Sequence, residues 1–485
     1  MGGADSYLTR IPRGSTVVET VDLERYGVGR FGDARLEVRG ALLHEALVAN
    51  PGCRIRRIAG GERRREMGFT RFLRNPRVSP SALSQAAAAR VADRVEGRDV
   101  LAIQDTSQIV LGNREKAKQG YGPVGKGGNL RGVLMHPVLA VDAASGDLLG
   151  LVDVEIWNRH GRQRVTKART RPKAERESRR WGAGAARAGE VLAKARSVTA
   201  VMDREGDDYH DFAHRPENVH ILTRVKHDRK IETGEPGKDM VLSKYVKGLP
   251  EAGRFTIDVP AAPGRAARRA KLALRFGPVT IKAPTSGMRA QERKALPPTV
   301  RLHVVEVREV EAPEGAEPLR WLLLTSHEVA DSATARRIVG FYRLRWIVEE
   351  YFRTLKTAGF QLEDSDLSDP EAFMNFAAMA AIAAVTITQL LRARDNPGGQ
   401  TLLDAFDPQD EPVIEAICAD FEGPSPTPRQ TNPHPRGTMA RATWVIGRLG
   451  GWTGYYGKPG PRILNRGFER FKAIRYGARL NAGDL

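Results

Sequence analysis

Cysteine is almost absent from this sequence of 485 residues, which contains two such residues, Cys53 and Cys418. They lie far apart, and neither has Cys or His neighbours at the spacing of a zinc site. Both are therefore interpreted as ordinary buried thiols of a reducing compartment. A structural zinc ion is not expected.

Long hydrophobic runs are also missing. The most apolar stretch, FAAMAAIAAVTITQLL from Phe376, is shorter than the roughly 20 residues needed to span a bilayer. It is better interpreted as a buried helix. The first residues, MGGADSYLTRIPRG, lack the apolar core of a secretory signal. We therefore expect a soluble protein with no membrane partner.

Acidic residues are in short supply, with 58 Asp and Glu against 77 Lys and Arg, a formal charge of +19. This excess favours a polyanionic partner, nucleic acid first and an anionic membrane surface second. The Gly-rich loop Gly120 to Gly132 lacks the G-x-x-x-x-G-K-[ST] pattern and does not lie between a strand and a helix. A nucleotide cofactor is therefore not expected.

One stretch, Ser332 to Lys356, has apolar residues at helical spacing, with Ser332 as the expected N-cap. Within it Tyr342, Arg345, Glu349 and Lys356 fall inside an arc of about 60° at the α-helical increment. An aromatic ring, two cations and a carboxylate thus share one face. Taken alone, this face could equally be a solvated stripe of ion pairs.

Two further carboxylates end apolar runs elsewhere in the chain. Asp105 follows VLAIQ, and Asp203 follows SVTAVM. An Asp at the end of a buried strand is costly unless it faces a cleft, a metal ion or a partner. With Glu349, these residues form an acidic triad that could hold divalent cations through oxygen ligands.

The spacing Tyr-x2-Arg-x3-Glu-x6-Lys resembles the YREK motif of DDE-type cut-and-paste bacterial transposases, especially the transposon five and insertion-sequence-four family. The resemblance extends from about residue 32 to residue 477, and its blocks occur in the family's order. These blocks are QDTS at Asp105, ERESRRW at Glu175 to Trp181, MDREGDD at Asp203, TRVKHDRK at Thr223 to Lys230, and WLLLTS from Trp321.

The resemblance implies that Asp105, Asp203 and Glu349 are the catalytic, metal-binding residues. Two Mg²⁺ ions per active site are implied, with Mn²⁺ as a substitute. The cations are expected to clamp the attacking and leaving oxygens of a phosphodiester. Three further groups of residues are implied to contact DNA: Tyr342, Arg345 and Lys356 on the helix; Trp321, Arg224 and Lys226 near a flipped base; and Arg63, Arg64 and Arg65 near the N-terminus.

Alternatives remain for several of these positions. Glu350 is a rival to Glu349, although it lies about 100° off the shared face, and Asp207 and Asp208 are rivals to Asp203. Trp321 could instead be a core residue at the start of a strand. The sequence also departs from the family pattern. MDREGDDYHDF carries a Gly and an extra acid, and the match around Arg224 is offset by one residue.

The fold class expected is α/β, with a ribonuclease-H-like core. Residues 1–78 would form a helical DNA-binding domain, or else a basic solvated bundle face. Residues 79–375 would form the catalytic domain, with a β-rich insertion over about 224–325. Residues 376–485 would form a C-terminal helical dimerisation domain, or else pack onto the core. The segment from Val133 to Trp157 is expected to be a hairpin that turns at Ser145-Gly146.

These features predict a DNA transposase that acts as a homodimer on double-stranded transposon ends and target DNA. The steps implied by the family are end cleavage, hairpin formation and resolution, and strand transfer. Its expected location is the bacterial cytoplasm, in association with the nucleoid. The alternatives are a metal-dependent endonuclease without strand transfer and a non-catalytic DNA-binding inhibitor of transposition.

Overall fold

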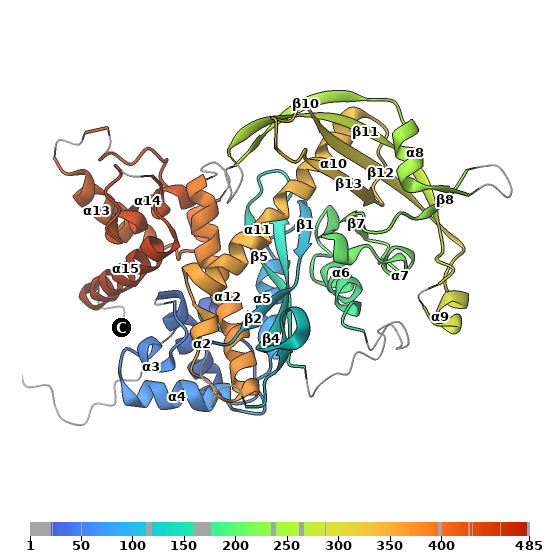
Figure 1. Ribbon diagram of the computed structural model, residues 1–485. Coiled ribbons are helices and arrows are strands. Elements are labelled where there is room, and N and C mark those ends of the chain that lie inside the picture. Colours follow the sequence, from blue (N-terminus) through green and yellow to red (C-terminus); the bar gives the residue numbers. More distant parts are fainter. Residues whose placement is uncertain are drawn as a thin grey trace, which may run out of the picture.

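The computed structural model describes residues 21, 23–49, 51–112, 119–159, 176–233, 239–260, 266–286, 288–395, 400–424, 427–428, 430–455 and 457–482. Helices from both ends of the chain lie together at one side of the molecule, and a large sheet occupies the other (Figure 1). Mixed α/β architecture is thus confirmed.

The thirteen strands of the described residues form one sheet, in the order β2-β4-β1-β6-β7-β13-β12-β11-β8-β9. β3 and β5 also pair with β4, and β10 pairs with β11. The strands are β1 (Asp99–Gln104), β2 (Ser107–Val110), β3 (Gly122–Val124), β4 (Leu130–Asp142), β5 (Leu148–Trp157), β6 (Ser197–Met202), β7 (Val219–Arg224), β8 (Lys230–Glu232), β9 (Asp239–Val241), β10 (Gly253–Val259), β11 (Arg268–Lys282), β12 (Thr299–Val310) and β13 (Arg320–Thr325).

The helices cover the sheet and build the second, helical part of the molecule. The α-helices are α1 (Leu23–Tyr26), α2 (Ala34–Ala49), α3 (Ile55–Ile58), α4 (Arg63–Leu73), α5 (Pro80–Ala92), α6 (Arg179–Val191), α7 (Tyr209–Ala213), α8 (Leu242–Gly248), α9 (Ala290–Ala295), α10 (Ser332–Leu344), α11 (Trp346–Arg353), α12 (Pro370–Asp395), α13 (Asp410–Glu422), α14 (Met439–Leu449) and α15 (Pro461–Ala482). Short 3₁₀ turns are η2 (Lys126–Gly128), η5 (Arg204–Gly206), η7 (Leu362–Asp364) and η8 (Leu402–Asp404), and η6 (Thr354–Ala358) is a π-helical turn.

The centre of the sheet is buried on both faces. β1, β6 and β7 are parallel neighbours, and β4 runs antiparallel to β1. Side chains alternate along β1, as the period of a strand requires. Leu101 belongs to an apolar cluster with Ile338 of α10, whereas Val100 belongs to a second cluster with Ala185 of α6. Burial on both faces explains why VLAIQ and SVTAVM are continuous apolar runs.

The expected hairpin is present. β4 and β5 pair antiparallel, and Gly146 in their turn has a φ of +74°, which favours glycine. The β-rich insertion does not form a separate unit, because its strands extend the central sheet. β13 pairs with β7 and with β12, and β12 pairs with β11 over twelve residue pairs.

Helix α12 is the central helix of the helical part. The helix extends beyond the apolar run that begins at Phe376, at both of its ends. Among the described helices, it is the one whose length and composition would allow it to cross a membrane. In the most apolar window of α12, 83% of the residues are buried, as expected for a core helix. Residue 376 lies within α12, so no break in the chain separates the expected catalytic and C-terminal domains at that point.

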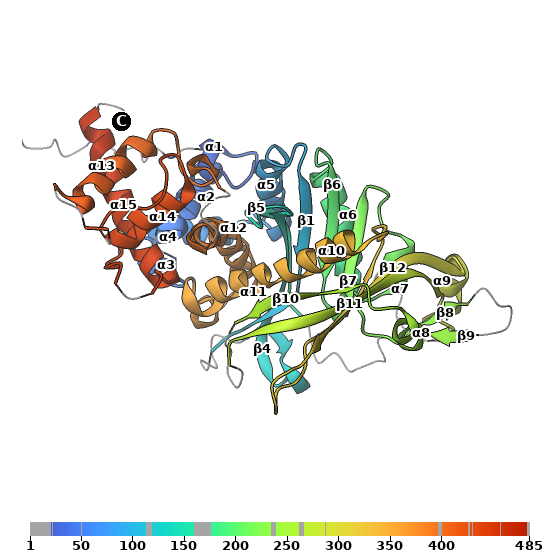
Figure 2. The same ribbon diagram turned by 90° about the horizontal axis from the view of Figure 1, so that it is seen from above.

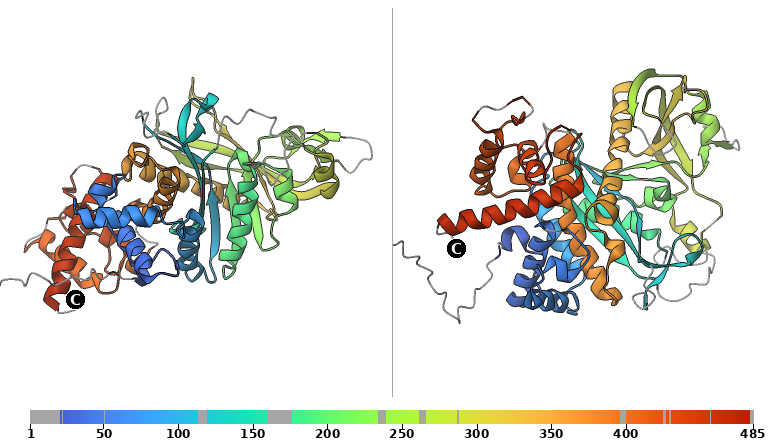
Figure 3. Two further views of the ribbon diagram at one scale, coloured as in Figure 1. Left: turned by 90° about the horizontal axis from the view of Figure 1, so that it is seen from below. Right: turned by 60° about the vertical axis from the view of Figure 1, so that its left-hand side comes forward.

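The N-terminal and C-terminal helices lie side by side (Figure 3). Charged side chains join them, since Lys472 of α15 lies 3.2 Å from Glu45 of α2 and Arg475 lies 3.5 Å from the same carboxylate. Arg475 also lies 3.4 Å from the buried Asp410 of α13. These contacts hold the N-terminal helices against the C-terminal helices.

Candidate active site

Two of the predicted acids lie at the same edge of the sheet. β1 and β6 are parallel, with Asp99 opposite Ser197, so Asp105 and Asp203 both follow the carboxyl ends of neighbouring strands. The backbone N–H of Thr106 donates to Asp105 Oδ1 at 2.7 Å. Each carboxylate is therefore presented at the end of a rigid, buried strand.

Asp203 begins the next loop and caps the short turn η5. Its Oδ1 accepts a hydrogen bond from the backbone N–H of Glu205 at 2.7 Å. The hydroxyl of Thr223, at the end of β7, donates to the Asp203 carbonyl at 2.8 Å. The parallel neighbour strand thus also fixes the Asp203 backbone.

Glu349 comes to this edge on α11, and Arg345 connects it to Asp105. Arg345 Nη1 lies 2.8 Å from Asp105 Oδ2, and Arg345 Nη2 lies 3.2 Å from Glu349 Oε1. α10 and α11 follow one another across the sheet (Figure 2). The arginine therefore holds carboxylates from two elements that are far apart in the sequence.

The charge balance of the site is visible in the pKa of Asp105, which is raised to about 6. Burial is the largest cause, and the negative charge of Asp203 is the second. The Arg345 guanidinium opposes this effect, and the Glu349 charge adds to it. The three acids are therefore close enough to interact, and one cation does not offset their combined charge.

This donor set matches the chemistry of a divalent cation. Carboxylate oxygens are the protein ligands that Mg²⁺ and Mn²⁺ prefer. Over the part of the chain that the structure describes, however, no three His, Cys, Asp or Glu side chains are grouped closely enough to hold an ion. The Arg345 guanidinium lies between two of the acids and pairs with both instead. A bound cation would need this arginine to move.

The rival acids have structural partners. Glu350 faces α12, with Oε2 3.7 Å from Arg392 Nη1. Asp207 is buried, pairs with Arg229 at 2.6 Å, and accepts hydrogen bonds from the backbone N–H groups of residues 226 and 227. Asp208 caps α7 by accepting from the His210 N–H. These contacts use the carboxylates to hold loops and helices.

The stretch from Ser332 to Lys356 differs in detail from the single helix expected. Asp331 is the N-cap, with Oδ1 accepting from the Thr334 N–H at 2.7 Å, so Ser332 is the first helical residue. A one-residue turn at Arg345 separates α10 from α11. Lys356 lies in the π-helical turn η6, where the α-helical increment no longer applies, and its Nζ is 3.5 Å from Glu363.

The aromatic residues predicted to contact DNA pack against each other next to Arg345. Tyr342 is buried at 7% exposure, and its ring meets the half-buried Trp321 edge-on at 5.7 Å. Burial raises the pKa of the Tyr342 hydroxyl, which also hydrogen-bonds Arg345. Arg224 donates to the Arg320 carbonyl at 3.1 Å, and burial lowers the pKa of Arg224. Trp321, Tyr342 and Arg224 form one supporting layer.

The remaining predicted cations are at the surface. Lys226 is exposed in the loop after β7. Arg63 and Arg64 are exposed at the start of α4, and Arg63 pairs with Glu66 at 3.1 Å. Arg65 lies over the Phe69 ring at 5.7 Å. The arginines of α4 are not among the partners of the acidic edge.

Trp346 was not predicted as a site residue, although it is the most exposed large hydrophobic residue of the described chain, at 63% exposure. It directly follows Arg345 and precedes Glu349 by three positions. The sequence does contain a feature that could have identified Trp346: it falls outside the apolar stripe of its helix, whose members include Ile347 and Val348. An exposed indole is a surface on which an unpaired base can stack.

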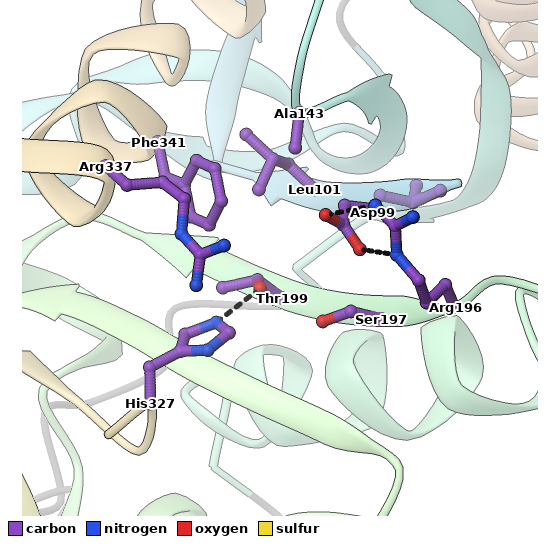
Figure 4. Close-up of a pocket in the computed structure, with 10 residues that line it drawn as sticks. Asp99, Leu101, Ala143, Arg196, Ser197, Thr199, His327, Arg337 and Phe341 are labelled. Atoms are coloured by element: carbon purple, nitrogen blue, oxygen red, sulfur yellow. Dashed lines mark hydrogen bonds and ion pairs between the residues drawn. The ribbon is translucent and has the colours of Figure 1, made fainter. Parts of the chain in front are cut away.

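A separate cavity of about 280 Å³ lies at the opposite edge of the central strands (Figure 4). It contains none of the predicted site residues. Its polar side chains bind one another: Arg196 forms two hydrogen bonds with Asp99, and His327 Nε2 lies 2.7 Å from the Thr199 hydroxyl. These polar side chains of the cavity therefore already have hydrogen-bond partners within it.

Comparison with protein families agrees with the chemistry of this edge. A family model described as "Transposase DDE domain" matches residues 96–386, which is more than half of the chain. The matched segment includes Asp105, Asp203 and Glu349. Enzymes with this domain cleave and transfer DNA, generally with the help of divalent metal ions. The chain therefore belongs to the DDE transposase family and is an enzyme that acts on DNA.

Proposed function

We propose that this protein is a cut-and-paste transposase of the transposon five and insertion-sequence-four type. The observation that carries the proposal is the arrangement of Asp105 and Asp203 at the ends of two adjacent parallel strands, with Glu349 joined to Asp105 through Arg345. The order β5-β4-β1-β6-β7 supports a ribonuclease-H-like core, since three parallel strands follow an antiparallel hairpin.

In this proposal Asp105, Asp203 and Glu349 would hold two Mg²⁺ ions. Such ions activate the attacking oxygen and stabilise the leaving oxygen of a phosphodiester. The chain's own contribution is positioning: the strand ends fix both aspartates, and α11 supplies the third carboxylate. Arg345 is then released from the acids and is available to bind a phosphate, as Lys356 is from η6.

The DNA would lie along the exposed groups around this edge. Trp346 offers an open indole surface for an unpaired base, and Trp321 supports Tyr342 from behind. Lys226 and the arginines of α4 would contact phosphates, with α4 belonging to the helical domain of residues 1–78 that reads the transposon end. The net charge of +19 supports contact over a large surface.

Homodimerisation in the DNA complex is part of the proposal. Its support is the exposed apolar side chains on α15, where Ile474 is 41% and Tyr476 is 56% exposed. The C-terminal helical domain, from residue 376 onward, would then join two protomers on paired transposon ends. The complete cycle would comprise end cleavage, hairpin formation and resolution, and strand transfer.

The test uses labelled duplexes that carry the terminal repeats of the element that encodes the protein, incubated with Mg²⁺. Wild-type protein should produce hairpin-capped ends and then joined products, and Glu349→Ala should produce neither. Glu350→Gln is the matched control, since Glu350 faces Arg392, and this variant should retain cleavage.

Three results would change the proposal. Cleavage without hairpins or joining would indicate an endonuclease. Tight DNA binding without cleavage in the wild type would indicate a non-catalytic inhibitor. Full activity of Glu349→Ala together with loss in Glu350→Gln would show that the wrong glutamate was assigned.

A further inference from the structure

Gln104 and Thr106, the two residues that flank Asp105, belong to a chain of hydrogen bonds beside the candidate active site. This chain runs from Arg180 to its neighbour Trp181 and so forms a closed ring. Arg180 Nε lies 2.6 Å from Thr106 Oγ1, which lies 2.8 Å from His136 Nδ1. His136 Nε2 lies 3.0 Å from Gln104 Oε1, and Gln104 Nε2 donates to the Trp181 carbonyl at 3.2 Å. We call these five residues the buried ring. It begins and ends on α6.

The donors and acceptors of the buried ring are consistent around the circuit. The Gln104 amide nitrogen donates to Trp181, so its oxygen can only accept, and His136 Nε2 must carry the proton. His136 Nδ1 is then an acceptor for the Thr106 hydroxyl, which in turn accepts from Arg180. Gln104, His136 and Trp181 are each at most 2% exposed, and Arg180 is 8% exposed. Water therefore has little access to replace a missing partner.

Arg180 also reaches the loop of the second aspartate. Its Nη2 lies 2.9 Å from Glu205 Oε2, and the backbone N–H of Glu205 donates to Asp203 Oδ1. Its Nη1 donates to the Glu177 carbonyl at 2.7 Å. One guanidinium thus connects the segment after β1 with the segment after β6.

We propose that Arg180 is a positioning residue that sets the relative placement of Asp105 and Asp203, and so controls how tightly the site binds divalent cations. The inference rests on the proposed role of the two aspartates. Arg180 does not itself contact either carboxylate among its described hydrogen bonds. It acts through Thr106 on one side and Glu205 on the other.

The shape of the arginine side chain explains why this position needs a guanidinium. Three nitrogens of Arg180 serve three partners in different directions, which a single ammonium group on a lysine cannot do at once. The guanidinium carbon also lies 5.6 Å from the rings of both Trp157 and Trp181, which limit its movement.

Gly184 indicates how closely α6 approaches the buried ring. A Cβ atom at this position would collide with Gln104 Oε1, the atom that accepts the hydrogen bond from His136 in the buried ring. Glycine therefore permits the helix to close the ring next to β1. An added methyl group here should disturb the ring without removing any of its members.

The experiment measures Mn²⁺ binding directly by isothermal titration calorimetry on the full-length protein, and measures DNA cleavage as a function of Mg²⁺ concentration. Arg180→Ala and Arg180→Lys should weaken Mn²⁺ binding by about tenfold to a hundredfold, the usual cost of losing an outer-shell partner. Their binding to transposon-end DNA without metal should stay within about twofold of wild type, as expected for a change that spares phosphate contacts.

Arg179→Ala is the matched control, because the neighbouring Arg179 is half exposed and pairs with Glu155, which is not a member of the buried ring. It should bind Mn²⁺ as the wild type does. Glu205→Gln tests the second arm at an exposed position that does not threaten folding, and should weaken Mn²⁺ binding in the same direction.

Equal Mn²⁺ affinity in wild type, Arg180→Lys and Glu205→Gln would overturn the proposal. Mn²⁺ affinity equal to wild type in Arg180→Lys, but reduced in Arg180→Ala, would show that Arg180 supplies charge and does not position the aspartates. This result would also overturn the proposal. The proposed function fails separately: Asp105→Asn and Glu349→Ala would then leave Mn²⁺ binding unchanged in an otherwise wild-type protein.

Discussion

Replacing Arg345 with alanine would leave Asp105 and Glu349 without the cation that joins them. The contact with Asp105 is the stronger arm, because it spans 2.8 Å and both side chains are 17% exposed. At an effective dielectric constant of about 20, two unit charges about 4 Å apart interact by about 4 kcal/mol, before the cost of desolvation. The Glu349 arm is longer and more exposed, and solvent screens it.

After desolvation, we expect Arg345→Ala to lower the free energy of unfolding by about 1–3 kcal/mol in the absence of divalent ions. For a chain of this size, that loss corresponds to a fall in Tm of about 1–3 °C. The same change removes the cation that competes with a metal ion for the acids. Mg²⁺ should therefore bind the variant roughly tenfold more tightly, a difference of about 1.4 kcal/mol.

Scanning calorimetry with and without Mg²⁺ separates these effects, because an ion that binds only the folded state raises Tm. The Tm deficit of Arg345→Ala should shrink or vanish at saturating Mg²⁺. Arg343→Ala, two residues earlier at the end of α10 and outside the ion pairs of the site, is the control and should match the wild-type Tm both without and with Mg²⁺. A Tm deficit that is unchanged by Mg²⁺, or weaker Mg²⁺ binding by Arg345→Ala, would refute the reasoning.

Three further predictions concern other residues. Trp346→Ala should weaken binding to single-stranded or unpaired DNA by about 1–3 kcal/mol per stacked base, measured by fluorescence anisotropy, with little change in Tm because the indole is 63% exposed. Acidification should destabilise the protein through His327, whose pKa is lowered from 6.5 to about 3 mainly by burial. The neutral His327 side chain makes its full contribution to the free energy of unfolding above pH 6.5, and this contribution is lost as the pH falls toward 3. The loss is about 1.4 kcal/mol per pH unit, and so about 2 kcal/mol at pH 5. Asp147→Asn should raise the free energy of unfolding at pH 7 by about 1 kcal/mol. Burial raises the pKa of Asp147, which means that its negative charge destabilises the folded state at pH values where the carboxylate is ionised. This gain should shrink near pH 4 in denaturant titrations.

Each of these predictions has a matched control. Trp452→Ala, at the C-terminal side, should not affect binding to unpaired DNA. His327→Gln should remove most of the steep loss of stability below pH 6.5, and a slope that persists in this variant would assign it elsewhere. Asp142→Asn should destabilise, since the pKa of Asp142 is lowered by hydrogen bonds from the N–H groups of residues 144 and 145. Stabilisation by both asparagine variants would contradict the argument for Asp147.

Several local features could be predicted because they depend on neighbouring residues in the chain. Continuous apolar runs before Asp105 and Asp203 are typical of strands buried on both faces, and both strands are present. The hairpin turn at Ser145-Gly146 follows from turn chemistry. The cap at Asp331 instead of Ser332 was missed, because both residues are good caps and only the backbone conformation distinguishes them.

Features that depend on strand order and burial could not be predicted. The sequence predicts a β-rich insertion between the second and third acids, but only the structure shows that β13 pairs with β7 and makes this segment part of the central sheet. Tyr342 is polar and lies on the same face as Arg345, but Trp321 covers it. The pattern of side chains predicts which face of one helix or strand is apolar. Whether a residue on that element is buried depends on which other elements pack against it.

The sequence by itself determined the charge of the protein, and it predicted three candidate acids and the kind of element that carries each of them. Periodicity and strand-end position are encoded within a few residues, and the family motif adds their order along the chain. Only the tertiary structure decided that Arg345 bridges Asp105 and Glu349, that Glu350 faces Arg392, and that Arg180 connects the loops of both aspartates. Those contacts join residues up to 240 positions apart, and their distances follow from how strands and helices pack.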